Sequence, residues 1–259
     1  MTVRRGIFVA PFDELYDPRL LARLAARAEE RGWDGFFVWD HVVYSPPVRS
    51  VADPWVALAA VACATERVAI GPLVTPLARR RVAKLARETV TLDHLSGGRT
   101  VFGAGLGGER HGEFGPFGDP DDPRERARLL DEGLERLAAY WDGELEPGPA
   151  QRADGPQGAA PGRIPVWIAG RWPNRRPLRR AARWDGFFPI DLHDPAQLAE
   201  MTAELRELRG ADAGPFEVIV SNTAGDPADW EAAGATWRLE EFGPSPSAAE
   251  VRAAIDAGP

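Results

Sequence analysis

An acidic and a basic side chain stand next to each other where an apolar run of the chain ends. Asp40-His41 follows Gly35–Trp39, a run that is apolar throughout and typical of a strand covered on both faces. A carboxylate can hold an imidazole in place, and an imidazole exchanges protons near neutral pH. The pair therefore indicates acid/base chemistry, while the alternative that His41 only packs at the rim of the fold stays open.

A second candidate acid lies in a glycine-rich segment. Glu109 follows Gly103–Gly108, and glycines allow the backbone to approach a bound molecule closely. Gly107 and Gly108 are the positions that we single out for such an approach. Because no Lys-Ser or Lys-Thr pair follows, the segment is not a nucleotide-binding P-loop. A tight loop without a ligand is the alternative.

A third segment, Gly170–Arg176, suits an anion. It precedes a predicted helix, and the free amides of a helix N-terminus together with Arg171 could hold a phosphate group. The arginines that follow, Arg179, Arg180 and Arg183, are better interpreted as a solvated basic face.

Short apolar runs alternate with amphipathic stretches along the rest of the chain. We expect strands at 4–10, 35–39, 68–73, 100–106, 166–169, 186–190, 216–222 and 235–239, and helices at 18–31, 53–65, 81–95, 123–141, 177–183, 195–209, 227–233 and 247–257. Eight strands, each followed by a helix, in 259 residues predict one α/β domain spanning residues 1–259 and built as a (β/α)8 TIM barrel. The Gly/Pro-rich stretch 143–165, after the fourth helix, is expected to be an irregular loop.

A barrel of this kind would bring the three segments together, because its functional residues lie on the loops after the carboxyl ends of the strands. We expect Trp39, Trp172 and Trp237 at the same mouth, where they could wall an aromatic ligand. An open doubly wound sheet is the alternative. Its first strand-to-helix turn usually carries a glycine fingerprint, and Pro11–Glu14 has none.

The composition excludes several functions. A net charge of −8 argues against a nucleic-acid partner, and no apolar stretch is long enough to span a membrane. The single cysteine, Cys63, which we expect to be buried, excludes a disulfide framework within the chain. The four histidines lack the paired spacing of metal ligands, so we expect no metal site. We expect a cytoplasmic protein.

Several runs of the sequence resemble the bacterial-luciferase-like superfamily. They are Gly32–His41, Gly71–Pro76, Arg87–Arg99, Val101–Phe117, Ile164–Gly170 and Trp184–Phe187, and they follow one another in order within residues 4–242. Members of that superfamily are (β/α)8 barrels that use reduced FMN to activate oxygen or the deazaflavin coenzyme F420 to move hydride. The resemblance therefore implies an oxidoreductase with F420 or FMN as its cofactor.

The resemblance also implies roles for particular residues. The cofactor ring would lie in the barrel mouth, with a non-proline cis peptide bond behind it at Pro72–Leu73 or its neighbour. The cofactor phosphate would rest on the loop that begins at Gly170. His41 and Glu109 would be the catalytic acid/base groups. The implied cofactor-binding residues are Asp40, Pro72, Leu73, Val74, Gly107, Gly108, Ala169, Gly170, Arg171, Trp172 and Asn174.

Three functions stay open on the sequence alone. The first is hydride transfer between a deazaflavin and a small organic substrate, the second is an FMN-dependent monooxygenase that uses molecular oxygen, and the third is a flavin-binding barrel without turnover. Deazaflavin-dependent members often have a tryptophan four residues after the histidine, whereas this chain has Ser45 there, beside Tyr44. We also expect a homodimer, because members commonly dimerise through helices two and three, and Trp55 with the small-residue face 57–64 would permit it.

Overall fold

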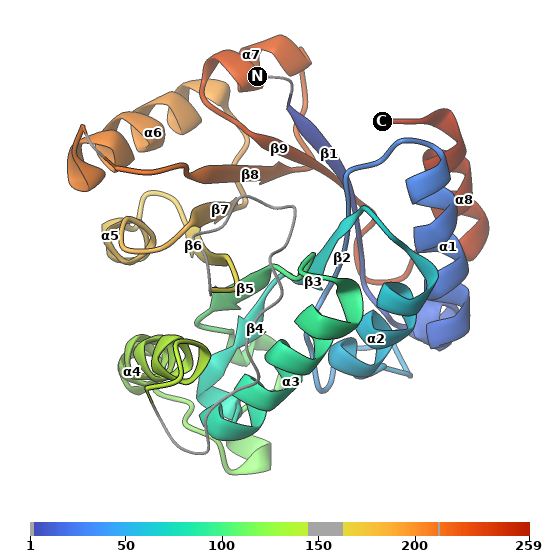
Figure 1. Cartoon of the computed structure of the whole chain (residues 1–259), viewed down its shortest axis with the longest axis horizontal. Coiled ribbons are helices and arrows are strands. Elements are labelled where there is room, and N and C mark those ends of the chain that lie inside the picture. Colours follow the sequence, from blue (N-terminus) through green and yellow to red (C-terminus); the bar gives the residue numbers. More distant parts are fainter. Residues whose placement is uncertain (1–2, 145–162, 212) are drawn as a thin grey trace.

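The computed structural model describes residues 3–144, 163–211 and 213–259 of the chain. These residues form nine strands: β1 (Arg4–Val9), β2 (Gly35–Val38), β3 (Ala69–Pro72), β4 (Thr75–Pro76), β5 (Phe102–Gly105), β6 (Val166–Arg171), β7 (Gly186–Ile190), β8 (Glu217–Ser221) and β9 (Trp237–Glu241). Neighbouring strands run parallel in the order β3-β2-β1-β9-β8-β7-β6-β5-β4. A bridge joins Ile70 in β3 to Thr100, just before β5, and β4 continues the chain from β3 to pair with β5, so the strands close into the predicted (β/α)8 barrel (Figure 1).

The third strand of the barrel is interrupted at its carboxyl end. β3 pairs with β2 up to Pro72, and the chain then resumes as β4, which pairs with β5. The two residues between them, Leu73 and Val74, are joined by a non-proline cis peptide bond. The predicted strand 68–73 is therefore followed by a second short strand that the sequence pattern does not reveal.

Helices cover the outside of the barrel (Figure 1). They are α1 (Pro18–Glu30), α2 (Pro54–Ala64), α3 (Val82–Ser96), α4 (Pro123–Trp141), α5 (Arg175–Ala181), α6 (Pro195–Arg209), α7 (Pro227–Ala232) and α8 (Ala248–Ala257). Five of them begin with an aspartate that accepts a backbone N–H of the first turn and is followed by proline: Asp17, Asp53, Asp122, Asp194 and Asp226. Proline suits the first helical position, where no N–H partner is needed, so these pairs fix where the helices start.

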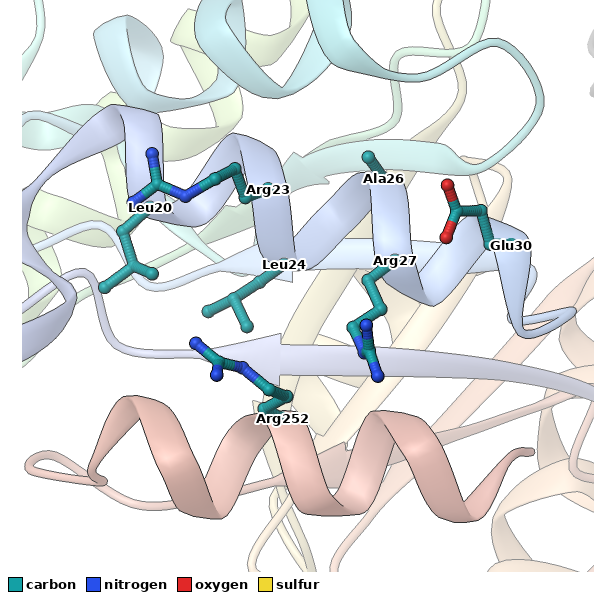
Figure 2. Close-up of a pocket in the computed structure, with 7 residues that line it drawn as sticks. All are labelled: Leu20, Arg23, Leu24, Ala26, Arg27, Glu30 and Arg252. Atoms are coloured by element: carbon teal, nitrogen blue, oxygen red, sulfur yellow. The ribbon is translucent and has the colours of Figure 1, made fainter.

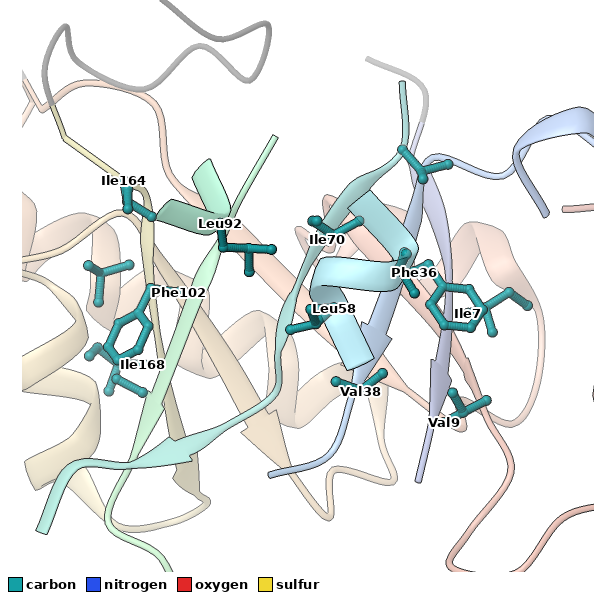
Figure 3. Close-up of a cluster of buried hydrophobic side chains, with 14 of the residues drawn as sticks. Ile7, Val9, Phe36, Val38, Leu58, Ile70, Leu92, Phe102, Ile164 and Ile168 are labelled. Carbon is teal, nitrogen blue, oxygen red and sulfur yellow. The ribbon is translucent and has the colours of Figure 1, made fainter. Parts of the chain in front are cut away.

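Two apolar layers hold the barrel together. The outer layer lies between strands and helices and joins Phe36, Ile70 and Phe102 on strands to Leu58 and Leu92 on helices (Figure 3). The inner layer fills the barrel, because every second residue of a strand points inward. It comprises Phe8, Phe37, Ala69, Leu73, Val101, Trp167, Ala169, Phe188, Ile219, Trp237 and Leu239.

Three sequence expectations meet a different outcome. α5 begins at Arg175, ahead of the predicted start, because Asn174 caps it. Trp237 is the first residue of β9 and is fully buried inside the barrel, so it lies away from the mouth. Cys63 is exposed, since it lies on the outward face of α2.

Most of the stretch 143–165 falls outside the described residues. Among the described helices, none combines the length and the apolar character that crossing a bilayer requires.

Candidate active site

His41 is held by a buried glutamate that lies 72 residues further along the chain. Its Nδ1 atom lies 2.9 Å from Oε2 of Glu113, whose side chain is only 2% exposed. The backbone N–H of Val42 donates to the other carboxylate oxygen at 3.2 Å. Because a carboxylate accepts hydrogen bonds, it fixes the imidazole proton on Nδ1 and leaves Nε2 as the nitrogen for proton exchange. The His41 side chain keeps 23% of its surface exposed.

Asp40 does not hold His41, contrary to the sequence interpretation. Its fully buried carboxylate accepts hydrogen bonds from Thr75 Oγ1 at 2.7 Å, from Arg79 Nη2 at 2.8 Å and from Arg80 Nη2 at 2.8 Å. Successive side chains of an extended chain point to opposite sides, so Asp40 and His41 meet different partners. Contact between Asp40 and a cofactor stays a prediction.

Arg79 joins the two buried carboxylates. Its Nη1 atom lies 2.6 Å from Glu113, its Nη2 atom bonds Asp40, and its side chain is 2% exposed. Arg79 also donates to the main-chain oxygen of Asp40 at 2.6 Å. Buried charges are tolerated when each is paired and hydrogen-bonded. The series Asp40, Arg79, Glu113, His41 therefore ties the loops after β2, β4 and β5 together and fixes the imidazole on the barrel.

This network keeps both carboxylates ionised. Burial raises the pKa of Asp40, but the charges of Arg80 and Arg79 and the hydrogen bond from Thr75 outweigh burial, so the pKa lies below its ordinary value. Burial likewise raises the pKa of Glu113, and the hydrogen bond and charge of His41 together with the charge of Arg79 bring it below the ordinary value. Folding therefore favours the proton-free form of each group.

We expect the free energy of unfolding to fall as the pH drops below about 4.5, since unfolded aspartate and glutamate take up protons near their ordinary pKa values of roughly 4. The contribution of Asp40 and Glu113 is fully present above that range and is lost as the pH falls through their lowered folded-state values. Urea unfolding between about pH 3 and pH 6 measures the effect. Glu113→Gln removes one of the two groups, so its stability should depend less steeply on pH. If the free energy of unfolding depended equally on pH in the variant and the parent, Glu113 would not contribute to the pH dependence.

Aromatic rings surround His41. The ring centroids of Phe12, Trp39 and Tyr44 lie 5.7, 5.7 and 5.1 Å from that of the imidazole. These contacts restrict the movement of the imidazole. A substrate that reaches His41 therefore meets a largely aromatic wall.

A second imidazole stands beside the first. His111 stacks on Tyr44 with 3.9 Å between ring centroids, and its Nδ1 atom lies 2.8 Å from Ser45 Oγ. Burial and then the charge of His41 lower the pKa of His111, so this ring is neutral at pH 7. Ser45 is thus part of a serine–histidine pair at the rim.

Glu109 turns back onto its own loop. Its carboxylate accepts hydrogen bonds from the backbone N–H groups of Phe114 at 2.9 Å and Gly115 at 3.2 Å. The side chain therefore braces the loop after β5, and its acid/base role stays a prediction. Gly107 has a φ of +68°, and a Cβ there would lie 2.5 Å from the Phe114 ring, whereas a Cβ at Gly108 would meet no atom within 4 Å.

The upper end of the barrel interior is an apolar floor. Trp39, Val74 and Ile190 pack on the inner layer and remain partly exposed. The cis peptide bond joins Val74 of this floor to Leu73 of the inner layer. Trp39 Nε1 is buried without a hydrogen-bond partner among the described residues. A planar ring with polar edges, such as a flavin or deazaflavin, fits these features, because its face can cover the floor and its edge can accept the indole N–H.

The loop after β6 carries the predicted phosphate residues. Arg171 is exposed and forms an ion pair with Asp191, which follows β7. The Arg175 guanidinium lies over the Trp172 ring, 4.1 Å from its centroid. Both arginines are therefore already engaged with protein groups, and Arg171 would have to exchange Asp191 for a phosphate.

Two other residues of this loop have structural roles. Asn174 accepts a hydrogen bond from the Arg176 N–H at 3.1 Å and so caps α5. Gly170 leaves room for Pro177, because a Cβ at position 170 would lie 2.3 Å from the proline Cβ. Neither role excludes a phosphate, and phosphate binding by the loop stays a prediction.

A hollow on the outer surface lies apart from these groups. It is lined by residues of α1 between Leu20 and Glu30 and by Arg252 of α8 (Figure 2). The same two helices are joined by an ion pair between Arg27 and Asp256 at 2.5 Å. The hollow therefore lies between two helices of the outer layer, outside the barrel.

Glu113, Arg79 and Arg80 are site residues that the sequence patterns do not single out. Glu113 lies in the same loop as Glu109, and the two arginines follow β4. Their one sequence signal is a place on loops at the carboxyl ends of strands. Which side chain of such a loop reaches a neighbouring loop depends on packing in three dimensions.

Known proteins resemble this chain in sequence. The sequence model described as luciferase-like monooxygenase matches residues 7–253. An uncharacterized protein of Mycobacterium tuberculosis is 30% identical over 227 residues, which cover 75% of this chain and 76% of that protein. An F420-dependent glucose-6-phosphate dehydrogenase of Beutenbergia cavernae is 36% identical over 136 residues, which cover 51% of this chain but only 39% of that enzyme.

Solved structures share the fold. The coenzyme F420 dependent tetrahydromethanopterin reductase from Methanopyrus kandleri superposes with a TM-score of 0.70 at 16% identity, over 97% of this chain and 96% of that chain. The oxygenating constituent of 3,6-diketocamphane monooxygenase from Pseudomonas putida, in complex with FMN, has a TM-score of 0.66 at 19% identity, over 85% and 67%. At these identities the likeness is one of architecture.

Proposed function

Because the chain belongs to the luciferase-like monooxygenase family, we propose that it is an oxidoreductase that transfers hydride between F420 and a small organic substrate. The observation that carries the proposal is the imidazole of His41, held at the barrel mouth by buried Glu113. Hydride transfer to or from a carbon–oxygen group requires a proton to move to or from the oxygen. A held imidazole can exchange that proton. The relative that depends on F420 supports F420 as the cofactor.

The residues at the mouth would divide the task of holding the cofactor. Trp39 and Val74 would support the ring, and Arg171 would bind its phosphate. When bound, the deazaflavin supplies or takes up the hydride. The full set that we propose for cofactor contact is Asp40, Pro72, Leu73, Val74, Gly107, Gly108, Ala169, Gly170, Arg171, Trp172 and Asn174, together with Trp39.

The chain's own groups would handle the proton. His41 Nε2 accepts a proton from a substrate hydroxyl or returns one to a carbonyl oxygen. Glu113 fixes the ring during that exchange, and Arg79 balances the charge of Glu113. Glu109 is proposed as a second acid/base group on the adjoining loop. The aromatic wall formed by Phe12, Trp39 and Tyr44 would exclude water from the exchange.

Cofactor binding tests this proposal. We expect reduced F420 to quench tryptophan fluorescence with a Kd well below roughly 1 mM, because Trp39 lies in the floor of the mouth, and we expect reduced FMN to bind more weakly. If neither cofactor binds in that range, the proposal fails. Oxygen uptake coupled to product formation with reduced FMN would favour a monooxygenase. Tight binding with no turnover that depends on His41 would favour a barrel without catalysis.

We also propose that the protein is a homodimer and works in the cytoplasm, where the exposed thiol of Cys63 would stay reduced. Trp55 is buried within the chain, so it is not the contact surface expected from the sequence. Val56 on α2 and Leu95 on α3 are 63% and 46% exposed and support contact through these two helices. Light scattering should give twice the chain mass of 28.2 kDa, and the mass of a single chain would contradict the proposal.

A further inference from the structure

Glu241 is an acidic residue that β9 carries to the mouth of the barrel. Trp237 and Leu239 on the same strand belong to the inner layer. Because side chains alternate along a strand, the next inward position is Glu241, at the carboxyl end of β9. In the strand register Glu241 lies opposite Phe8 of β1, which also belongs to the inner layer. The carboxyl group therefore sits above the packed interior.

The surroundings of Glu241 are neutral. Asn222 Nδ2 donates to its carboxylate at 3.3 Å, and the Ser221 hydroxyl also donates to it. Among the described residues, no arginine, lysine or histidine comes within 4.0 Å, whereas Asp40 and Glu113 each have a cationic partner. Burial raises the pKa of Glu241, and the hydrogen bond from Ser221 offsets only part of that rise. A partly buried carboxyl at a barrel mouth without a counter-charge is a candidate for ligand binding.

Glu241 and the residues around His41 lie on the same side of the mouth, because β9 pairs with β1 and β1 pairs with β2. Its charge, after burial and the charges of Arg110 and Glu113, contributes to the shifted pKa of Tyr44, so the two side chains lie within electrostatic reach of each other. The Tyr44 ring in turn lies 5.1 Å from the imidazole of His41. A molecule bound beside Tyr44 could contact both His41 and Glu241.

We propose that Glu241 is a substrate-binding residue that accepts a hydrogen bond from a hydroxyl group and selects neutral, hydroxyl-bearing substrates over anionic ones. The inference rests on the proposed function and names the substrate class of the same site. A carboxylate repels a phosphate group, whereas it can accept a hydrogen bond from a neutral hydroxyl group without a second charge being buried. The groups around the carboxyl are Ser221 at the end of β8, Asn222 just after that strand and Phe8 of β1, and Tyr44 from the loop after β2 lies within electrostatic reach.

The test uses the F420-loaded enzyme with two matched probes, glucose and glucose 6-phosphate, and with propan-2-ol as a smaller alcohol. The parent should favour the neutral probes in kcat/KM. Glu241→Ala should raise KM for them by about 10- to 100-fold, the loss of one charge-assisted hydrogen bond. Glu241→Gln removes the negative charge, so the ratio of kcat/KM for glucose to kcat/KM for glucose 6-phosphate should be smaller than in the parent. Glu240→Ala and Glu240→Gln are the matched controls, because Glu240 is exposed and points outward on the same strand.

A second measurement does not need turnover. In protein labelled with ¹³C at the glutamate carboxyl, the signal lost in Glu241→Gln identifies Glu241, and the neutral probes should shift that signal in the F420-loaded enzyme. A parent that favours glucose 6-phosphate, a Glu241→Ala variant that matches Glu240→Ala, or a carboxyl signal that no neutral probe shifts would each overturn the inference. Failure of F420 to bind the parent would instead sink the proposed function, and fluorescence titration of each variant separates the two results.

Discussion

Replacement of His41 by alanine is expected to lower kcat with F420 by about 10²- to 10⁴-fold, the range that a positioned acid/base group contributes. The variant keeps the Trp39–Val74 floor, so the Kd for F420 should stay within a few-fold of the parent value. The substitution should therefore slow the reaction without weakening the binding of the cofactor. Steady-state rates with saturating F420, paired with fluorescence titration, measure both quantities.

His94→Ala is the matched control for this experiment. His94 is exposed in the last turn of α3, at the end of the barrel opposite the mouth. The same substitution at that position should leave kcat and cofactor binding unchanged. Equal rates for the two variants would remove His41 from the mechanism and favour a barrel that binds its cofactor without acid/base catalysis.

Glu113→Gln should lower kcat less than His41→Ala does. Glutamine can still contact His41 Nδ1, but its amide can donate as well as accept, so the imidazole is no longer confined to one tautomer. NMR of ¹⁵N-labelled histidine measures which nitrogen of His41 carries the proton. The proton should lie on Nδ1 in the parent and be divided between Nδ1 and Nε2 in the variant. An unchanged tautomer with an unchanged kcat would make Glu113 only a structural partner of Arg79.

The barrel follows from the sequence because its signals are local. Alternating apolar runs and amphipathic stretches give eight strand–helix pairs, and Asp-Pro pairs such as Asp53-Pro54 fix helix starts through capping. The two-residue strand β4 is not predicted, because it contains only Thr75 and Pro76 and shows no periodicity. The position of Trp237 is also predicted wrongly, because the predicted strand 235–239 begins two residues before β9. Such a shift changes how far along the barrel axis each residue of the strand lies.

The centre of the candidate site is predicted less completely from the sequence than the barrel is. His41 is found from its position after β2, but its partner was expected to be Asp40, the neighbour in sequence. The true partner is set by the meeting of three loops, in which Arg79 pairs with both carboxylates and Asp40 is sealed away from the imidazole. Sequence spacing describes contacts within an element, whereas an ion network between loops depends on how the barrel closes.

Arg79→Met is expected to destabilise the protein by about 3–5 kcal/mol, because it leaves the buried carboxylates of Asp40 and Glu113 without their shared cation. For a chain of this size the loss corresponds to a fall in Tm on the order of 10 °C. Arg128→Met is the matched control, since Arg128 also joins two carboxylates, those of Glu125 and Glu132, but on an exposed face of α4. Exposed pairs are screened by water, so that variant should unfold like the parent. Chemical unfolding at pH 7 measures both. If Arg79→Met and Arg128→Met unfold at the same denaturant concentration, the buried network does not hold the mouth together, and the position of His41 must depend on the aromatic wall alone.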